Sequence, residues 1–197
     1  MRRVVKVGGS LLSRKELPAQ LRDWSEQQQR PAENIVIVGG GELIDAIRNL
    51  DSLRPGDASD VHWRCVDLLR TTFEFFCDWF PDWDHVRSDE EFQRGVDFGF
   101  SSGKPTVIEV GAFYQRGDDS GLPLDWRTTT DSIAAVLAIR SKADEVVLLK
   151  SCDLDPTLCV GEMIADGITD EALGIVAEKL AKLRVEKLPL LAQRVAK

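Results

Sequence analysis

Short apolar runs recur along the chain, and most of them lack the alternating polar positions of a strand that faces water. They cover residues 35–38 and 145–149, and shorter β-branched runs within residues 2–7 and 106–110 predict strands as well. A continuous run of this kind predicts a parallel strand that is covered on both faces. Residues 183–188 predict a further strand at an edge of the same sheet.

Polar, helix-prone stretches separate these runs. Asp57 or Ser59, Ser88, and the pair Thr130-Asp131 stand where N-caps are expected. The alternation of strands and helices predicts a three-layer α/β/α sandwich around a mostly parallel open sheet. A length of 197 residues suits a single domain over residues 1–197. The helices are expected at residues 14–30, 42–50, 59–79, 88–94, 130–140 and 169–183.

Composition excludes several classes of function. The net charge is -8 and no basic face is visible, which argues against a nucleic-acid partner. No apolar run approaches the ~20 residues of a membrane span, and the run after Met1 is too short for a signal peptide. The four cysteines form no CxxC pair and have no histidine at zinc-ligand spacing, so we expect reduced thiols, no metal site and a cytoplasmic protein.

Glycines follow two of the predicted strands directly. Gly8-Gly9 ends the first, Gly39-Gly40-Gly41 ends the second, and Lys150-Ser151 ends the strand at 145–149. The carboxyl ends of parallel strands meet at one edge of the sheet, where ligands of open α/β sheets bind. Glycine lets backbone N–H groups approach an anion closely. Two such clusters predict facing sites for two phosphate or carboxylate groups, although simple tight turns would also use glycine.

Two lysines and an aspartate accompany the glycines. Lys6 lies two residues before Gly8, Lys150 ends a later strand, and Asp131 begins a helix. Lysine ammoniums can neutralise the charge that develops on a transferred phosphoryl group, and Asp131 could hold both lysines. The alternatives are a strand lysine at each position and an aspartate that only caps its helix.

Two common nucleotide-binding signatures are absent. Gly103-Lys104 is followed by Pro105 where a P-loop has Ser or Thr, and Phe98 stands at the first glycine position. Neither glycine cluster reads GxGxxG. A P-loop enzyme and a dinucleotide-binding fold are therefore unsupported.

Four segments resemble, in order, the signature blocks of the amino acid kinase superfamily, which includes acetylglutamate, uridylate, carbamate and isopentenyl phosphate kinases. They are Lys6–Ser10, Val38–Gly41, Thr130–Ala135 and Leu148–Ser151. A narrower resemblance is to the short aminomethylfuran phosphate kinases of methanofuran biosynthesis, a one-carbon cofactor pathway. It is carried by residues 60–63, 122–126, 130–132, 149–153 and 166–170.

This resemblance implies an ATP-dependent kinase that phosphorylates a small anionic acceptor such as aminomethylfuran phosphate. Mg²⁺ would arrive with ATP rather than in a protein cage. Lys6 and Lys150 would contact the phosphates and Asp131 would orient them. The nucleotide-binding residues would be Gly8, Gly9, Ser10, Ser151 and Asp153, and the acceptor-binding residues would be Gly39, Gly40, Gly41 and His62.

Three points stay open at this level. His62 is either an acceptor ligand or a structural histidine. The aromatic stretch 73–83 predicts core packing or a subunit contact, and the alternative is an aromatic wall of the acceptor pocket. We expect a homo-oligomer. The activity itself has alternatives, namely uridylate or isopentenyl phosphate kinase chemistry, or a non-catalytic nucleotide-binding or regulatory protein of the same fold.

Overall fold

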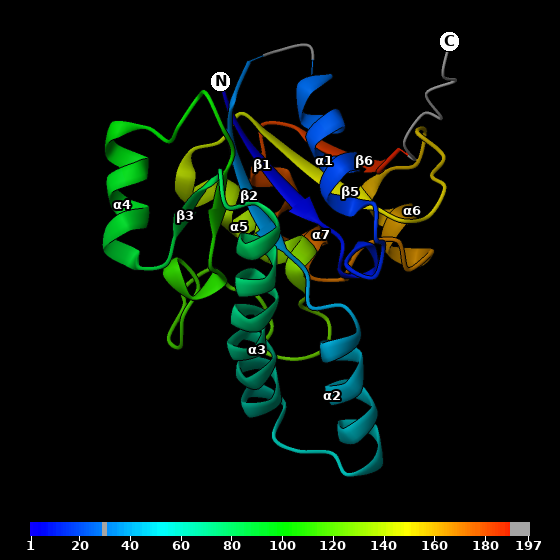
Figure 1. Ribbon diagram of the computed structural model, residues 1–197. Coiled ribbons are helices and arrows are strands. Elements are labelled where there is room, and N and C mark those ends of the chain that lie inside the picture. Colours follow the sequence, from blue (N-terminus) through cyan, green and yellow to red (C-terminus); the bar gives the residue numbers. More distant parts are fainter. Residues whose placement is uncertain (29–30, 190–197) are drawn as a thin grey trace.

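The computed structural model describes residues 1–28 and 31–189. Its strands and helices alternate for most of the chain (Figure 1). The strands are β1 (Arg2–Val7), β2 (Glu33–Val38), β3 (Asp84–Val86), β4 (Thr106–Ile108), β5 (Glu145–Lys150) and β6 (Leu183–Lys187). The helices are α1 (Leu17–Glu26), α2 (Glu42–Leu53), α3 (Ala58–Trp79), α4 (Asp89–Phe98), α5 (Thr130–Ser141), α6 (Val160–Ala165) and α7 (Leu173–Val176), with 3-10 turns η1 (Gly9–Leu11), η2 (Val110–Ala112) and η3 (Ala177–Lys179).

The six strands form one open sheet in the order β3-β4-β2-β1-β5-β6, and every neighbouring pair is parallel. β1 lies inside the sheet, with Lys6 beside Ile37 of β2 and Leu148 of β5. All carboxyl ends therefore open on the same edge. The α/β class and the mostly parallel sheet predicted from the sequence are confirmed.

Two hydrophobic clusters cover the two faces of this sheet. Val4 packs in the cluster that includes α5, α7 and the first half of α3. Val5 and Val7 pack in the other, against α1 and the second half of α3. Because side chains alternate between faces along a strand, Lys6 shares the face of Val4. The same rule places Lys150 on the face of Leu148, so both lysines point toward α5.

α5 is the central helix of that face. All its residues from Thr130 to Ala138 are buried. A helix that is covered on every side must be apolar or small nearly throughout, which the sequence Ile-Ala-Ala-Val-Leu-Ala provides. Its N-cap is Thr129, whose side chain accepts a hydrogen bond from the Asp131 N–H. The predicted cap at Thr130-Asp131 is thus wrong by one residue, and the Asp131 carboxylate serves another purpose.

The aromatic stretch lies mainly in the core. Phe73, Phe76, Phe80 and Trp83 are buried, whereas Phe75 is exposed. Packing explains most of this stretch without a subunit contact. Elsewhere, Asp57 and Ser88 cap α3 and α4 as predicted.

The last third of the chain differs from its prediction. The helix expected over residues 169–183 is replaced by α7, η3 and extended chain that leads into β6. The Ala172 N–H donates to the Arg127 carbonyl, and Asp170 accepts from Ser132 of α5. This segment therefore docks on the core instead of forming one long helix.

Two other elements differ from their predictions. β3 has only three residues and was missed. α1 begins at Leu17, three residues later than predicted, and part of its predicted end lies outside the described residues.

In the described part of the chain, no helix combines the length and the apolar character needed to cross a membrane.

Candidate active site

Asp131 joins the two lysines at the carboxyl edge of the sheet. Its Oδ1 lies 2.7 Å from the Lys6 Nζ, and its Oδ2 accepts a 2.5 Å hydrogen bond from the Lys150 Nζ. The three side chains come from β1, α5 and β5 and keep only 6%, 4% and 13% of their surface exposed. The structure thus brings together the three residues that the sequence singled out for catalysis. We call Lys6, Asp131 and Lys150 the lysine–aspartate triad.

Burial and charge oppose each other in the triad. Burial disfavours ionised Asp131, but the charges and hydrogen bonds of Lys6 and Lys150 outweigh it and hold the pKa of this carboxyl below its usual value. Burial, followed by the charge of Lys6, lowers the pKa of Lys150, and Asp131 offsets this only in part. Within the triad two cations face one anion, so the triad itself carries a net positive charge, and the nearby carboxyl of Asp170 acts on Lys150 as a further acidic group.

The two glycine loops pack directly against each other. A Cβ placed on Gly9 would lie 2.3 Å from the backbone nitrogen of Gly41, and one placed on Gly39 would lie 2.6 Å from that of Gly9. Gly41 also has a φ of 55°, a conformation that favours glycine. The glycines are therefore required for contact between the loops. Whether their N–H groups also bind phosphates stays a prediction.

The predicted nucleotide side lies around η1 and the end of β5. The Ser10 and Ser151 hydroxyls are 2.8 Å apart, which places both residues together as the glycine–serine pattern suggests. Arg14, which sequence reasoning missed, donates to the Ser151 carbonyl at 3.0 Å. Asp153 is almost fully exposed and pairs with Lys187 of β6 at 2.6 Å. Gly8 lies against β5, where its N–H donates to the Leu149 carbonyl.

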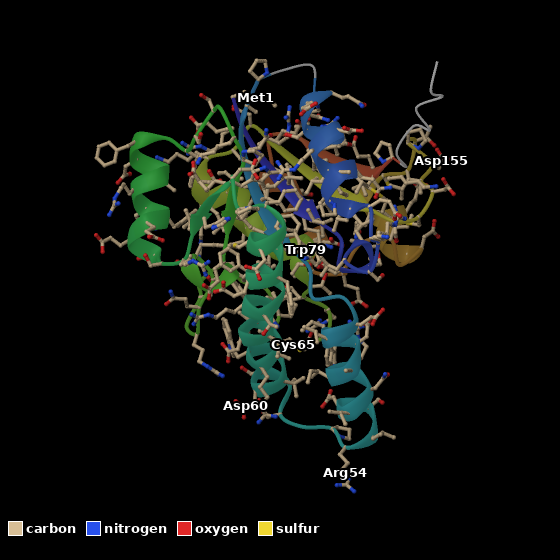
Figure 2. All side chains as sticks on the ribbon, viewed as in Figure 1. Met1, Arg54, Asp60, Cys65, Trp79 and Asp155 are labelled. Carbon is tan, nitrogen blue, oxygen red and sulfur yellow. The ribbon has the colours of Figure 1, made fainter. Side chains whose placement is uncertain are left out.

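A cavity of about 200 Å³ opens between α2, α3 and the chain that precedes α5. Its wall includes Gly9, Gly40, Gly41 and Thr130, so it meets the triad at the glycine loops. Figure 1 shows α2 and α3 extending side by side from the sheet, and Cys65, labelled in Figure 2, lies on the side of α3 toward α2. The predicted acceptor-binding residues Gly40 and Gly41 therefore lie in the wall of this cavity.

His62 lies in the wall of this cavity but is engaged with the protein. It is 5% exposed, and its Nε2 is 3.1 Å from the Tyr114 hydroxyl. Burial lowers its pKa despite a hydrogen bond to the Asp125 backbone. A neutral, hydrogen-bonded imidazole is a weak anion ligand, so the geometry favours the structural interpretation of His62.

Asp170 is a residue whose contacts sequence reasoning did not assign. Its Oδ2 accepts from the N–H and hydroxyl of both Thr129 and Ser132, at 2.7–3.0 Å, and its Oδ1 accepts from the Leu173 N–H. Burial, followed by the charge of Asp131, raises its pKa. Asp170 therefore fixes the first turn of α5, which presents Asp131. The only sequence signal is an aspartate just before a helix, which is too common to identify it.

Comparisons with known proteins bear on the fold. No protein-family model matches the chain, and no curated protein matches it. Among solved structures, the UMP kinase from Ureaplasma parvum is 12% identical over 96% of this chain and 91% of that chain, with a TM-score of 0.64. The UMP kinase from Bacillus anthracis is 14% identical over 98% of this chain and 89% of that chain, with a TM-score of 0.65.

The aspartate kinase from Synechocystis is 14% identical over 95% of this chain, with a TM-score of 0.63, but only 38% of that chain is matched. These neighbours belong to the amino acid kinase superfamily. At such identities the likeness concerns the fold alone, and none of the three is an aminomethylfuran phosphate kinase, so that narrower resemblance stays a prediction. The chain therefore has the amino acid kinase-like α/β fold that its four sequence blocks predicted.

Proposed function

We propose that this chain is an ATP-dependent kinase that transfers the γ-phosphoryl group to a small anionic acceptor in the cavity between α2 and α3. The observation that carries the proposal is Asp131, which holds the Lys6 and Lys150 ammoniums at the carboxyl edge of the sheet, beside two glycine loops. The fold shared with UMP and aspartate kinases supports it.

The triad suits the charge changes of phosphoryl transfer. Such reactions depend mainly on positioning and on stabilising negative charge. Lys6 and Lys150 are held in place before substrate arrives, so little reorganisation is needed. The Mg²⁺ that accompanies ATP would neutralise further phosphate charge. The surplus positive charge of the triad fits the phosphates of ATP.

For the acceptor we propose a phosphate monoester, with aminomethylfuran phosphate as the first candidate because of the sequence resemblance. In this step an acceptor phosphate oxygen bonds to the γ-phosphorus while the bond from that phosphorus to ADP breaks. A phosphate monoester has its second pKa near 6 and is mostly a dianion at neutral pH, so no proton must be removed. This agrees with the engagement of His62 by Tyr114.

ATP consumption with Mg²⁺ tests this proposal, using aminomethylfuran phosphate, isopentenyl phosphate, UMP and acetylglutamate as acceptors. Turnover with one acceptor, with ADP and phosphorylated acceptor in equal amounts, would support the kinase. Tight ATP binding without turnover of any acceptor would instead support a non-catalytic nucleotide-binding protein.

A further inference from the structure

We infer that the acceptor has a short apolar body behind its anionic group, and that a nucleoside monophosphate is not the preferred substrate. This inference rests on the proposed kinase function, because it assigns the cavity to the acceptor. On this inference the chain differs in its acceptor from the UMP kinases that share its fold.

One side of α3 forms the apolar wall of the cavity. Val61, Cys65, Val66 and Leu69 recur at helical spacing along it. Ile44 of α2 and Ile133 of α5 complete this wall from the other elements. A substrate body that packs there exchanges water for aliphatic side chains, which favours apolar groups.

Most polar side chains in the wall are already bound to other protein groups. The Trp126 indole N–H donates to Asp51 at 2.8 Å, and Asp125 binds the Arg127 guanidinium at 2.7 Å. His62 contacts Tyr114. The exception is the Asp45–Arg48 pair, whose atoms lie 2.7 Å apart but whose side chains stay 62% and 47% exposed.

A uracil and a ribose carry several hydrogen-bonding groups that lose water on entering such a site. Each group that stays unpaired costs on the order of 1–3 kcal/mol. The wall therefore selects against a nucleoside by leaving its polar edges unsatisfied.

The anionic end of the acceptor has a different environment. The cavity reaches Gly40 and Gly41, which precede α2, and the hydroxyl-bearing Thr130 beside Asp131. The first N–H groups of a helix have no intrahelical acceptor and favour an anion. An acceptor whose anionic group binds at these N–H groups has its body directed to α3 and its anionic group toward the triad.

The cavity is also small. Its volume of about 200 Å³ lies below the ~300 Å³ at which pockets for drug-sized ligands begin, so a short acceptor body fits it.

The test compares acceptors that share a phosphate but differ in their bodies. Isopentenyl phosphate has an apolar body, aminomethylfuran phosphate an aromatic body that carries an ammonium group, glycerol 3-phosphate a short polar body, and UMP a nucleoside. We expect kcat/KM for isopentenyl phosphate to exceed those for glycerol 3-phosphate and UMP by about 10²-fold or more, since two unpaired polar groups cost roughly this much. A preference for UMP or glycerol 3-phosphate would overturn the inference and leave the kinase proposal intact.

A substitution in the wall sharpens the test. Val66→Thr adds a hydroxyl with little change in volume, and we expect it to raise KM for the apolar acceptor about tenfold while KM for ATP is unchanged. Val96→Thr on α4, outside the cavity, is the matched control. Equal effects of the two variants would contradict the assignment of the wall.

Calorimetric binding of the same four esters keeps the inference testable if no acceptor is turned over. Failure of turnover then counts against the kinase proposal alone. Tighter binding of an apolar ester, weakened by Val66→Thr, would support the apolar site. Tighter binding of UMP than of isopentenyl phosphate, or no binding of isopentenyl phosphate, would overturn it.

Discussion

The two ends of β1 and β5 both carry buried ion pairs, but their surroundings differ. At the amino end, Arg3 and Glu145 are each 3% exposed and lie 2.7 Å apart. Arg3 also donates to Asn34 of β2, and Lys182 approaches Glu145 from the start of β6. This cluster links β1, β2 and β5, and the Glu145 carboxylate pairs with more than one cation.

At the carboxyl end, the triad lies beside two glycine loops and a cavity. Its carboxylate belongs to α5 rather than to a strand, and it holds two cations. The amino-end cluster also lines a cavity, whose wall includes Arg3 and Glu145. A buried ion pair beside a cavity therefore does not identify an active site by itself. What distinguishes the carboxyl end is the pair of glycine loops that follows β1 and β2.

The largest effect is expected from Asp131→Asn. The change leaves two buried lysines without their shared anion, so activity should fall on the order of 10³-fold and the free energy of unfolding by about 3 kcal/mol. Acceptor-dependent ATP turnover and urea unfolding measure the two losses. Normal turnover with reduced stability would show that Asp131, like Glu145, stabilises the fold and takes no part in the reaction.

Glu145→Gln should lower stability by a similar amount without lowering activity. Removing this charge leaves Arg3 buried beside Asn34 alone, which should cost about 3 kcal/mol of unfolding free energy, while kcat stays within about twofold because the triad is at the other end of the strands. Denaturant unfolding and turnover at saturating ATP test this, with exposed Glu178→Gln as control. A large loss of kcat in a folded Glu145→Gln protein would contradict the difference in function between the two ends of the strands.

Asp170→Asn addresses the support of the triad. The variant weakens charged hydrogen bonds to Thr129 and Ser132, so we expect about 2 kcal/mol less stability. We also expect a roughly tenfold loss of kcat with KM for ATP kept, because Asp131 is held less firmly. Asp166→Asn, an exposed carboxylate near the same turn, is the control. Lost stability with unchanged kcat would limit Asp170 to helix capping.

The pH dependence of activity gives the smallest effect. Since burial lowers the pKa of Lys150 below its usual 10.5, its charge is lost as pH rises through this lowered pKa, and kcat/KM should fall there. Lys150→Arg keeps its charge at high pH, so the fall in kcat/KM should occur at a higher pH in the variant. A fall at the same pH in both proteins would show that another group causes it.

The central strands and the triad follow from local sequence patterns. The apolar runs locate β1, β2 and β5, and the two-residue period puts Lys6 and Lys150 on one face. Asp131 meets them because its helix begins at the same edge. The common edge needs only the parallel arrangement of the sheet, whereas the common face also needs the register between β1 and β5.

Other features depend on contacts between distant segments. Asp170 binds residues 38 and 41 positions earlier in the chain, and Gly9 is constrained by Gly41. The short helix α7 and the turn η3 replace a predicted long helix because their chain docks on α5. No local pattern in the sequence reveals such contacts.

The most direct test of the central claim is kcat of Lys6→Met with the acceptor that the wild type uses. The change keeps most of the side-chain volume and leaves Asp131 paired with Lys150, so the fold should remain while one charge stabiliser is lost. We predict a fall in kcat of about 10²-fold or more with ATP affinity largely kept, and no fall in the exposed control Lys15→Met. A folded Lys6→Met protein with wild-type kcat would contradict phosphoryl transfer at this end of the sheet.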